Sequence, residues 1–270
     1  MIAFESVSQV YRGGTVAVDD VSFTVPSRST CVLLGSSGSG KTTLLRMVNR
    51  MVDPTGGRVL IDERDVRSLD AVRLRRSIGY VLQSGGLLPH RTVLDNVATV
   101  PVLDGVRRAE ARRRAHELLE LVGLDATAAR RHPAQLSGGQ QQRVGVARAL
   151  ANDPNILLMD EPFGAVDPIV RRELQAELRR LQADLGKTVL LVTHDVDEAF
   201  ALADQVVLLR PGGTIAQQGA PADLLTRPAG PFVEQFVGLG DPARNLSVAE
   251  QDGVGLVVDG TGRILGRLAR

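Results

Sequence analysis

Short apolar runs, each followed by a segment with helical spacing, recur along most of the chain. Residues 31–34, 156–159 and 188–193 are almost continuously apolar, which is typical of strands buried on both faces of a sheet. Residues 16–25 end in an alternation of apolar and polar side chains, which predicts a strand with one solvated face. This succession of strands and helices predicts an α/β fold.

The remaining elements follow from the same two periodicities. Further strands are predicted at residues 3–7, 58–62 and 78–82, with a hairpin of 206–209 and 214–216. Helices are predicted over residues 43–48, 141–150, 170–186 and 197–204, followed by two short helices within 222–238. Residues 69–77 form a short arginine-rich segment to which the pattern assigns no element.

From Thr92 the pattern becomes helical and interrupts the strand–helix alternation. Residues 93–97 and 107–122 carry apolar side chains at helical spacing. This predicts a helical subdomain of about residues 88–152, inserted into the α/β core. We expect the five arginines among residues 107–114 to form the solvated face of a helix, and contact with a partner or anionic lipid is the alternative.

Composition narrows the possible functions. The 270 residues could form one large domain or two smaller ones, and an apolar content of 43% supports a substantial core. The formal net charge of +1 gives no electrostatic reason to expect nucleic acid as the main partner. The single cysteine, Cys31, excludes an internal disulfide and fits a reducing compartment. No secretory signal and no run of 18 apolar residues is present, so we expect no membrane span.

A glycine-rich loop follows the first buried strand and precedes a helix. Its spacing, G-x-x-x-x-G-K-T, suits a phosphate, because glycines let successive backbone N–H groups point inward at a helix start. We expect Lys41 to reach the β- and γ-phosphates and the Thr42 hydroxyl to hold Mg²⁺; the alternative is a plain glycine turn. The loop consists of Gly35, Ser36, Ser37, Gly38, Ser39, Gly40, Lys41 and Thr42.

Polar residues capable of phosphate chemistry follow three other predicted strands. Asp160 and Glu161 end an apolar run, and strand alternation would direct Asp160 towards Mg²⁺ and Glu161 towards the attacking water. His194 lies just past the next buried strand, where it could hold the γ-phosphate. Gln83 ends another strand and could contact Mg²⁺ or a water, although alone it would be an ordinary loop residue.

Two more features have both a structural and a functional interpretation. Ser137 stands where a helix N-cap would stand, but a serine followed by two glycines at a helix start is also an anion site. A second such site far from the glycine-rich loop suggests that another copy of the chain completes it. Tyr11 is either an aromatic at a strand edge or a ring stacked on adenine.

Taken together, these elements resemble the ATP-binding subunit of ABC transporters over residues 1–240. The resemblance implies a RecA-like P-loop NTPase core, an antiparallel β subdomain and an inserted helical subdomain, with ATP and Mg²⁺ as cofactors. The matching features are Tyr11, the loop from Gly35 to Thr43, Gln83, the signature Ser137, Gly138, Gly139 and Gln140 with Leu136, the pair Asp160 and Glu161, a connector ending in Asp167, and His194.

The same resemblance implies how the subunit works. Two copies pair head to tail, so that Ser137 and Gly139 of one meet the γ-phosphate held by Lys41 of the other. Glu161 is then the general base and His194 the γ-phosphate switch, while Gln83 passes motion to a membrane permease. The chain would lie at the cytoplasmic face of the membrane as a peripheral subunit.

A narrower resemblance concerns the transported solute. Residues 83–90, 96–101, 131–135 and 161–168 look like importer subunits for quaternary amines such as glycine betaine, carnitine or choline, and for proline. An external solute-binding protein and the permease would hold the solute. Import of another solute, such as an amino acid, is an alternative; a cassette ATPase acting on DNA or ribosomes is disfavoured because this chain has one cassette and no coiled-coil insertion.

The tail, residues 241–270, departs from that narrower family. Many of its members end in a paired regulatory module of the cystathionine-β-synthase type, for which about 30 residues are too few. Residues 257–265 suggest one β-hairpin around an Asp-Gly turn, and we interpret it as a remnant of such a module that would either dock or be loose.

Overall fold

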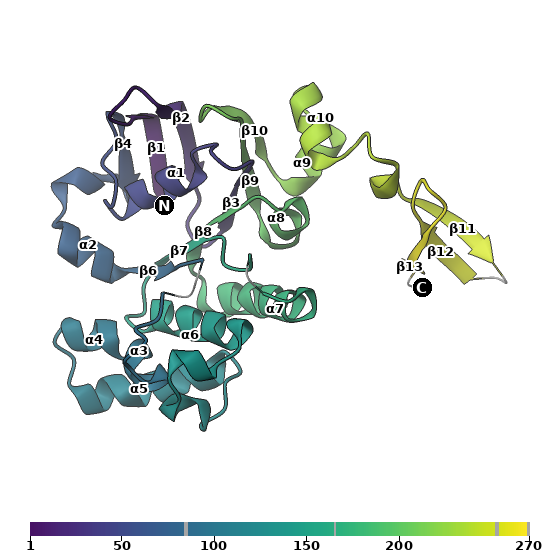
Figure 1. Cartoon of the computed structure of the whole chain (residues 1–270). Helices are drawn as coiled ribbons and strands as arrows, with labels where there is room; N and C mark the ends of the chain where they lie inside the picture. The colour runs from purple at the N-terminus through teal and green to yellow at the C-terminus, as the bar shows by residue number, and fades with distance from the viewer. Residues whose placement is uncertain (84–85, 165, 252–253, 269–270) are drawn as a thin grey trace.

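The central sheet has six strands in the order β10-β9-β3-β8-β7-β6 (Figure 1). The computed structural model describes residues 1–83, 86–164, 166–251 and 254–268. The five strands from β9 to β6 are mutually parallel, and β10 pairs with β9 antiparallel at one edge. The strands are β3 (Thr30–Gly35), β6 (Ile78–Val81), β7 (Ile156–Asp160), β8 (Thr188–Thr193), β9 (Gln205–Leu209) and β10 (Ile215–Gly219).

A second, antiparallel sheet has the strand order β2-β1-β4-β5. Phe4 of β1 lies opposite Phe23 of β2, and their rings stack with centroids 4.3 Å apart. This pair favours the observed register of the first hairpin, because a slip of one strand by one residue would turn its phenylalanine to the opposite face and away from the other ring. The strands are β1 (Ile2–Val10), β2 (Val16–Val25), β4 (Gly56–Ile61) and β5 (Arg64–Asp65).

Alternation along the central strands divides the interior into two cores. In β3, Cys31 and Leu33 face the antiparallel sheet and the helix after the glycine-rich loop, whereas Val32 and Leu34 face the core under the other helices. All four side chains are completely buried. The continuous apolar run is therefore required by a sheet covered on both faces, as the sequence predicted.

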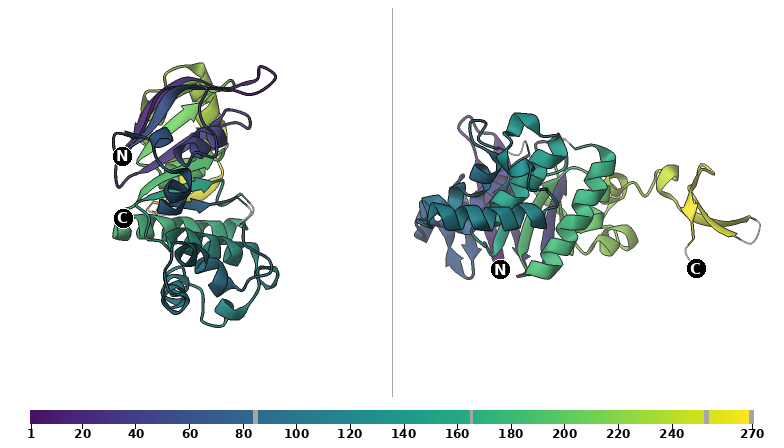
Figure 2. Two further views of the ribbon diagram at one scale, coloured as in Figure 1. Left: turned by 90° about the vertical axis from the view of Figure 1, so that its left-hand side faces the viewer. Right: turned by 90° about the horizontal axis from the view of Figure 1, so that it is seen from below.

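The helices lie on both faces of the central sheet and in a helical region between β6 and β7 (Figures 1 and 2). Asp70 caps the helix α2, the element that the sequence pattern did not assign, by accepting a hydrogen bond from the backbone of Arg73. The helices are α1 (Lys41–Val48), α2 (Ala71–Ser77), α3 (Val93–Val97), α4 (Thr99–Leu103), α5 (Arg108–Leu121), α6 (Gly138–Leu150), α7 (Pro168–Leu185), α8 (Val196–Leu202), α9 (Pro221–Thr226) and α10 (Pro231–Val237), with 3₁₀ turns at Val66–Ser68, Ala128–Arg130, Pro133–Gln135 and Pro242–Arg244.

The tail forms a separate small sheet that projects away from the rest of the molecule (Figures 1 and 2). The predicted hairpin is present as β12 (Val254–Val258) and β13 (Ile264–Arg267), and β11 (Ser247–Gln251) adds a third strand. The Asp259 carboxylate shapes the hairpin turn by accepting bonds from the backbone N–H groups of Thr261 and Arg263. Val248 and Ile264 remain 62% and 58% exposed, so this sheet buries little apolar surface.

In the part of the chain that the structure describes, no helix is long and apolar enough to cross a membrane.

Candidate active site

The glycine-rich loop connects β3 to α1 and has a backbone that only glycine tolerates at two positions. Gly38 and Gly40 have φ angles of 80° and 87°. A Cβ on Gly40 would lie 2.2 Å from the carbonyl oxygen of Ala17, so any side chain there would collide with the neighbouring strand. The glycines are thus required both by the turn and by the close approach of β2.

Lys41 is folded into this loop. Its Nζ donates hydrogen bonds to the carbonyl oxygens of Gly35 and Ser36, at 2.8 and 2.7 Å, and the residue is 5% exposed. Burial lowers the pKa of the Lys41 ammonium, while the nearby carboxylates of Glu161 and Asp160 oppose that shift. The Ser39 hydroxyl lies 3.4 Å from the same Nζ, so the cation is held by neutral oxygens, and a phosphate would supply the missing negative charge.

An open hollow lies beside the loop and brings sequence-distant residues together. The Tyr11 hydroxyl lies 3.2 Å from Oγ1 of Thr43, and the Tyr11 side chain remains partly exposed at the rim. Glu161 reaches the same hollow from the end of β7. The lining residues are Tyr11, Thr15, Val16, Ala17, Ser37, Gly38, Ser39, Gly40, Lys41, Thr42, Thr43 and Glu161.

Asp160 lies against the first turn of α1. Its Oδ1 accepts a 2.8 Å hydrogen bond from the Thr42 hydroxyl, and its Oδ2 accepts a 3.4 Å bond from the hydroxyl of Tyr80. The Arg46 guanidinium lies 3.7 Å from the same Oδ2. Sequence reasoning missed Tyr80 and Arg46; the only available signal was that the strand holding Tyr80 would adjoin the strand holding Asp160.

The residues around Asp160 fit a magnesium ion. The Thr42 hydroxyl and the Asp160 carboxylate are hard oxygen donors, which Mg²⁺ prefers in combination with phosphate oxygens and water. Gln83, whose Nε2 donates to Glu161, stays a predicted third ligand. Within the described residues, no group of three or more histidine, cysteine or acidic side chains is placed to hold a metal ion by itself. A site shared with a bound phosphate is therefore the arrangement that these donors allow.

Glu161 adopts a left-handed backbone conformation directly after β7. Its φ is 44°, and its N–H donates to the carbonyl oxygen of Val192 on β8. Strand alternation was predicted to separate Glu161 from Asp160, but the two residues are separated by this backbone turn past the strand end. A left-handed residue other than glycine costs free energy, and here it directs a carboxylate into the hollow.

The Glu161 carboxylate lies between the two other predicted catalytic residues. Nδ1 of His194 lies 3.3 Å from its Oε1, and Nε2 of Gln83 donates to its Oε2 at 3.0 Å. These three residues come from the ends of β8, β7 and β6, which are adjacent in the sheet. The carboxyl ends of these parallel strands lie at one edge of the sheet, where ligand-binding residues are predicted to gather. This explains why the three side chains are close together.

The signature residues and Asp167 lie outside this group. Ser137 and Gln140 exchange two hydrogen bonds in a capping box at the start of α6, and Asp167 caps α7. A Cβ on Gly139 would lie 2.7 Å from Val170, so this glycine lets α6 approach α7. None of these residues is among those lining the hollow at the glycine-rich loop, and their predicted nucleotide contacts stay predictions. Ser84, Gly85 and Ala165 of the predicted motifs lie outside the described residues.

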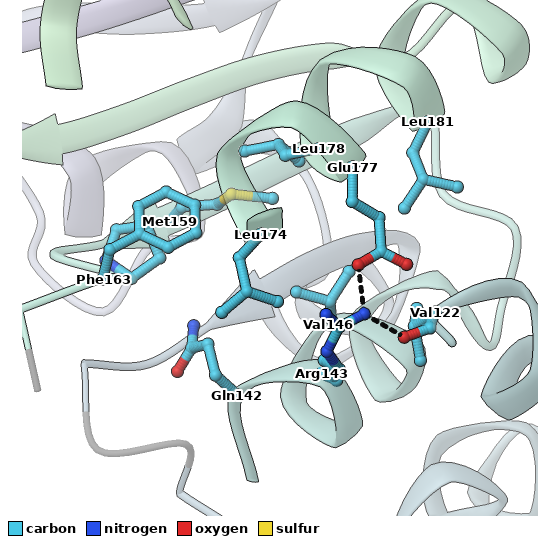
Figure 3. Close-up of a pocket in the computed structure, with 11 residues that line it drawn as sticks. Val122, Gln142, Arg143, Val146, Met159, Phe163, Leu174, Glu177, Leu178 and Leu181 are labelled. Carbon is cyan, nitrogen blue, oxygen red and sulfur yellow. Dashed lines mark hydrogen bonds and ion pairs between the residues drawn. The ribbon is translucent and has the colours of Figure 1, made fainter. Parts of the chain in front are cut away.

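Beneath α6, a narrow, mostly apolar cavity separates the signature helix from α7 and the end of β7 (Figure 3). Arg143 of α6 bridges it by donating hydrogen bonds to the Glu177 carboxylate and to the carbonyl oxygen of Val122. Burial raises the pKa of Glu177, against the opposing charge of Arg143. This ion pair ties α6 to α7 and to the end of α5.

Comparison with known proteins adds a family to this geometry. The family model described as ABC transporter matches residues 18–164. The chain is 48% identical over 238 residues to the carnitine transport ATP-binding protein OpuCA of Listeria monocytogenes, covering 88% of this chain and 60% of that protein. It is 51% identical over 238 residues to the glycine betaine uptake system ATP-binding protein YehX of Escherichia coli, covering 88% and 77%.

A solved dimeric structure of a bacterial ABC transporter cassette superimposes with a TM-score of 0.75 at 35% identity, covering 82% of this chain and 99% of the other. The predicted RecA-like P-loop NTPase fold is thereby confirmed. The chain spans 60–62% of the length of several curated relatives, OpuCA and OpuBA proteins, that it matches at 48% identity.

Proposed function

Because the chain belongs to the ABC transporter family, we propose that it is the ATP-hydrolysing subunit of an importer for compatible solutes. The observation that supports hydrolysis best is the position of Glu161. Its carboxylate lines the hollow of the glycine-rich loop and lies between His194 and Gln83. A carboxylate in that place is suited to accept a proton from water that attacks a phosphate bound by Lys41.

The predicted site residues in and beside the hollow then each have a part in in-line phosphoryl transfer. The N–H groups of the loop and Lys41 would bind the β- and γ-phosphates of the substrate ATP. Tyr11, at the edge of the hollow, would contact the adenine ring. Thr42, Asp160 and Gln83 would hold Mg²⁺, which neutralises charge on the phosphate oxygens. Glu161 takes the proton of the attacking water, and His194 holds the γ-phosphate and orients Glu161.

We propose that the active unit is a head-to-tail dimer. The capped start of α6, with the exposed Ser137, would be an anion site, and it is not part of the hollow of its own chain. A second copy would place this start, with Gly138, Gly139 and Gln140, and the neighbouring Asp167 against the γ-phosphate held by Lys41. The similar cassette that was solved as a dimer supports this arrangement.

The solute and the partners are inferred from the relatives. OpuCA of Listeria monocytogenes is described as acting in carnitine transport and YehX of Escherichia coli in glycine betaine uptake. We therefore propose that this chain drives import of glycine betaine, carnitine, choline or proline. A membrane permease would hold the subunit at the cytoplasmic face, and an external binding protein would deliver the solute.

Uptake in cells that lack the gene tests this proposal. Radiolabelled glycine betaine, choline, carnitine and proline are offered to the deletion strain, with and without wild-type or Glu161→Gln complementation. Loss of one uptake, restored by the wild type and not by the variant, is the expected result. If uptake of all four solutes is unchanged in a strain that has no redundant transporter, the compatible-solute proposal is wrong, while the ATPase proposal is tested separately by turnover of the purified chain.

A further inference from the structure

Arg171, in the first turn of α7, lies between the connector that follows Glu161 and the loop that carries His194. Its Nη1 donates to Oδ2 of Asp195 at 3.3 Å, and its Nη2 donates to the carbonyl oxygen of Val166 at 3.4 Å. The Arg171 side chain is 29% exposed. One guanidinium thus joins two loops that are about 30 residues apart in sequence and that both lead to the active site.

Asp195 is itself fixed on the other side. Its Oδ1 accepts hydrogen bonds from the backbone N–H groups of Asp197 and Glu198, at 2.9 and 3.1 Å, and so caps α8. Its own N–H donates to the Thr193 hydroxyl at 3.0 Å. His194 is the residue between Thr193 and Asp195, so the position of Asp195 sets the position of the histidine next to Glu161.

Arg171 is also the cation that this acidic region needs. The Glu198 carboxyl is buried at the start of α8, and the charges of Asp195, Arg171 and Glu161 all act on it. Nε of Arg171 is buried without a hydrogen-bond partner among the described residues. Both hydrogen bonds of the guanidinium are long, and its Nε–H group makes none in the part of the chain that the structure describes. A small movement of either loop can therefore change which acceptors the guanidinium contacts.

We propose that Arg171 is a positioning residue that holds the loop of His194 to the connector, so that a shift of the connector is passed on to His194. The inference rests on the proposed function, in which the connector up to Asp167 meets the second copy of the chain. Arg171 is not among the residues that line the hollow of the glycine-rich loop, and its proposed path to the chemistry runs through Asp195.

The test is ATP turnover by the purified full chain at a concentration that supports dimerisation. Arg171→Met is expected to lower kcat about tenfold, equivalent to about 1.4 kcal/mol, while the Kd for ATP stays within about twofold of the wild type. In a His194→Ala background, Arg171→Met is expected to cause no further loss of kcat, because the proposed effect of Arg171 on turnover requires His194. Arg172→Met, an exposed neighbour on α7, is the matched control and should leave kcat unchanged.

Asp195→Asn gives a second, independent variant. Asparagine caps helices about as well as aspartate, so α8 is kept while the ion pair with Arg171 is lost. It should lower kcat as much as Arg171→Met, and the double variant should lower it no further. Wild-type kcat in Arg171→Met, or a tenfold loss that persists without His194, overturns the inference and leaves the ATPase proposal intact. Absence of turnover in the wild type rejects both.

Discussion

The Thr42 hydroxyl donates a 2.8 Å hydrogen bond to Oδ1 of Asp160, joining two residues that are 118 positions apart in the chain. The bond places the hydroxyl at the start of α1 and the carboxylate at the end of β7 side by side. Both are oxygen donors, so they can share one Mg²⁺ when a nucleotide supplies the remaining ligands.

Thr42→Val should therefore weaken the metal dependence of nucleotide binding. We expect the Mg²⁺ concentration needed for half-maximal tightening of ATP binding to rise about tenfold, a typical cost for disturbing a metal site. Binding of ATP without metal should stay within about twofold of the wild type. Titration with a fluorescent ATP analogue, with and without Mg²⁺, measures both, and Thr42→Ser should restore the wild-type response because it keeps the hydroxyl.

Lys41→Ala should lose affinity for ATP. The substitution removes the buried ammonium that the loop carbonyl oxygens hold, and with it the positive charge available to the phosphates. We expect the Kd for ATP to rise at least about tenfold, or about 1.4 kcal/mol. Calorimetric titration tests this, with Arg73→Ala as a control cation exposed on α2. Unchanged affinity would count against the phosphate-loop assignment.

Glu161→Gln should separate binding from turnover. The amide keeps the shape of the carboxylate and can still accept the hydrogen bond from Gln83, but it cannot accept the proton of water. ATP affinity should stay within about twofold, kcat should fall at least about 100-fold, and light scattering should detect an ATP-bound dimer. Glu63→Gln, at an exposed turn, is the control. A monomeric variant with wild-type turnover would show that Glu161 is not the base.

Glu198→Gln should raise stability above neutral pH. Burial, followed by repulsion from Asp195, raises the pKa of Glu198 from 4.5 to about 7. Because the pKa is higher in the folded than in the unfolded chain, the free energy of unfolding falls as pH rises from about 4.5 to about 7 and then levels off. The shift corresponds to roughly 3 kcal/mol.

The neutral amide removes this penalty, so the variant should gain up to about 3 kcal/mol at pH 8 and much less at pH 5. Urea unfolding across this pH range measures the difference. An identical pH dependence in the variant and the wild type would show that Glu198 does not titrate in this way.

Truncation after Gly240 should keep basal ATP turnover within about twofold. None of the tail residues that the structure describes belongs to the two cores of the cassette. The ion pair between Arg244 and Asp197, at 3.0 Å, is an exposed contact to α8 and should contribute little. Arg244→Ala is the matched variant that removes this contact and the bond of Arg244 to the carbonyl oxygen of Val237 while keeping the rest of the tail. Loss of turnover on truncation, with activity kept in Arg244→Ala, would show that the tail sheet supports the cassette.

Sequence reasoning identified candidate site residues where the predicted chemistry is local. The glycine-rich loop, the apolar runs of β3, β7 and β8, and the polar residues at their ends could be read directly, because periodicity and short motifs encode them. The first hairpin and the helical insertion were found in the same way. Helix α2 was missed because its seven residues hold a single buried side chain, Leu74, and so show little periodicity.

The resemblance to a family added roles that no local pattern contained. The residues alone suggested two anion sites and a second copy of the chain that completes one of them; the resemblance added that the two copies pair head to tail. The tertiary structure keeps these sites apart within one chain, with the signature at the start of α6 and Lys41 at the start of α1.

The sequence by itself determined which residues are predicted to carry the chemistry, because a phosphate loop, a strand end and a capped helix start are defined by neighbours along the chain. Only the tertiary structure decided what these residues touch. The left-handed turn at Glu161, the reach of Tyr80 and Arg46 to Asp160, and the bridge from Arg171 to Asp195 each depend on how strands and helices are stacked. Such contacts join residues 24 to 114 positions apart, and no local pattern encodes that separation.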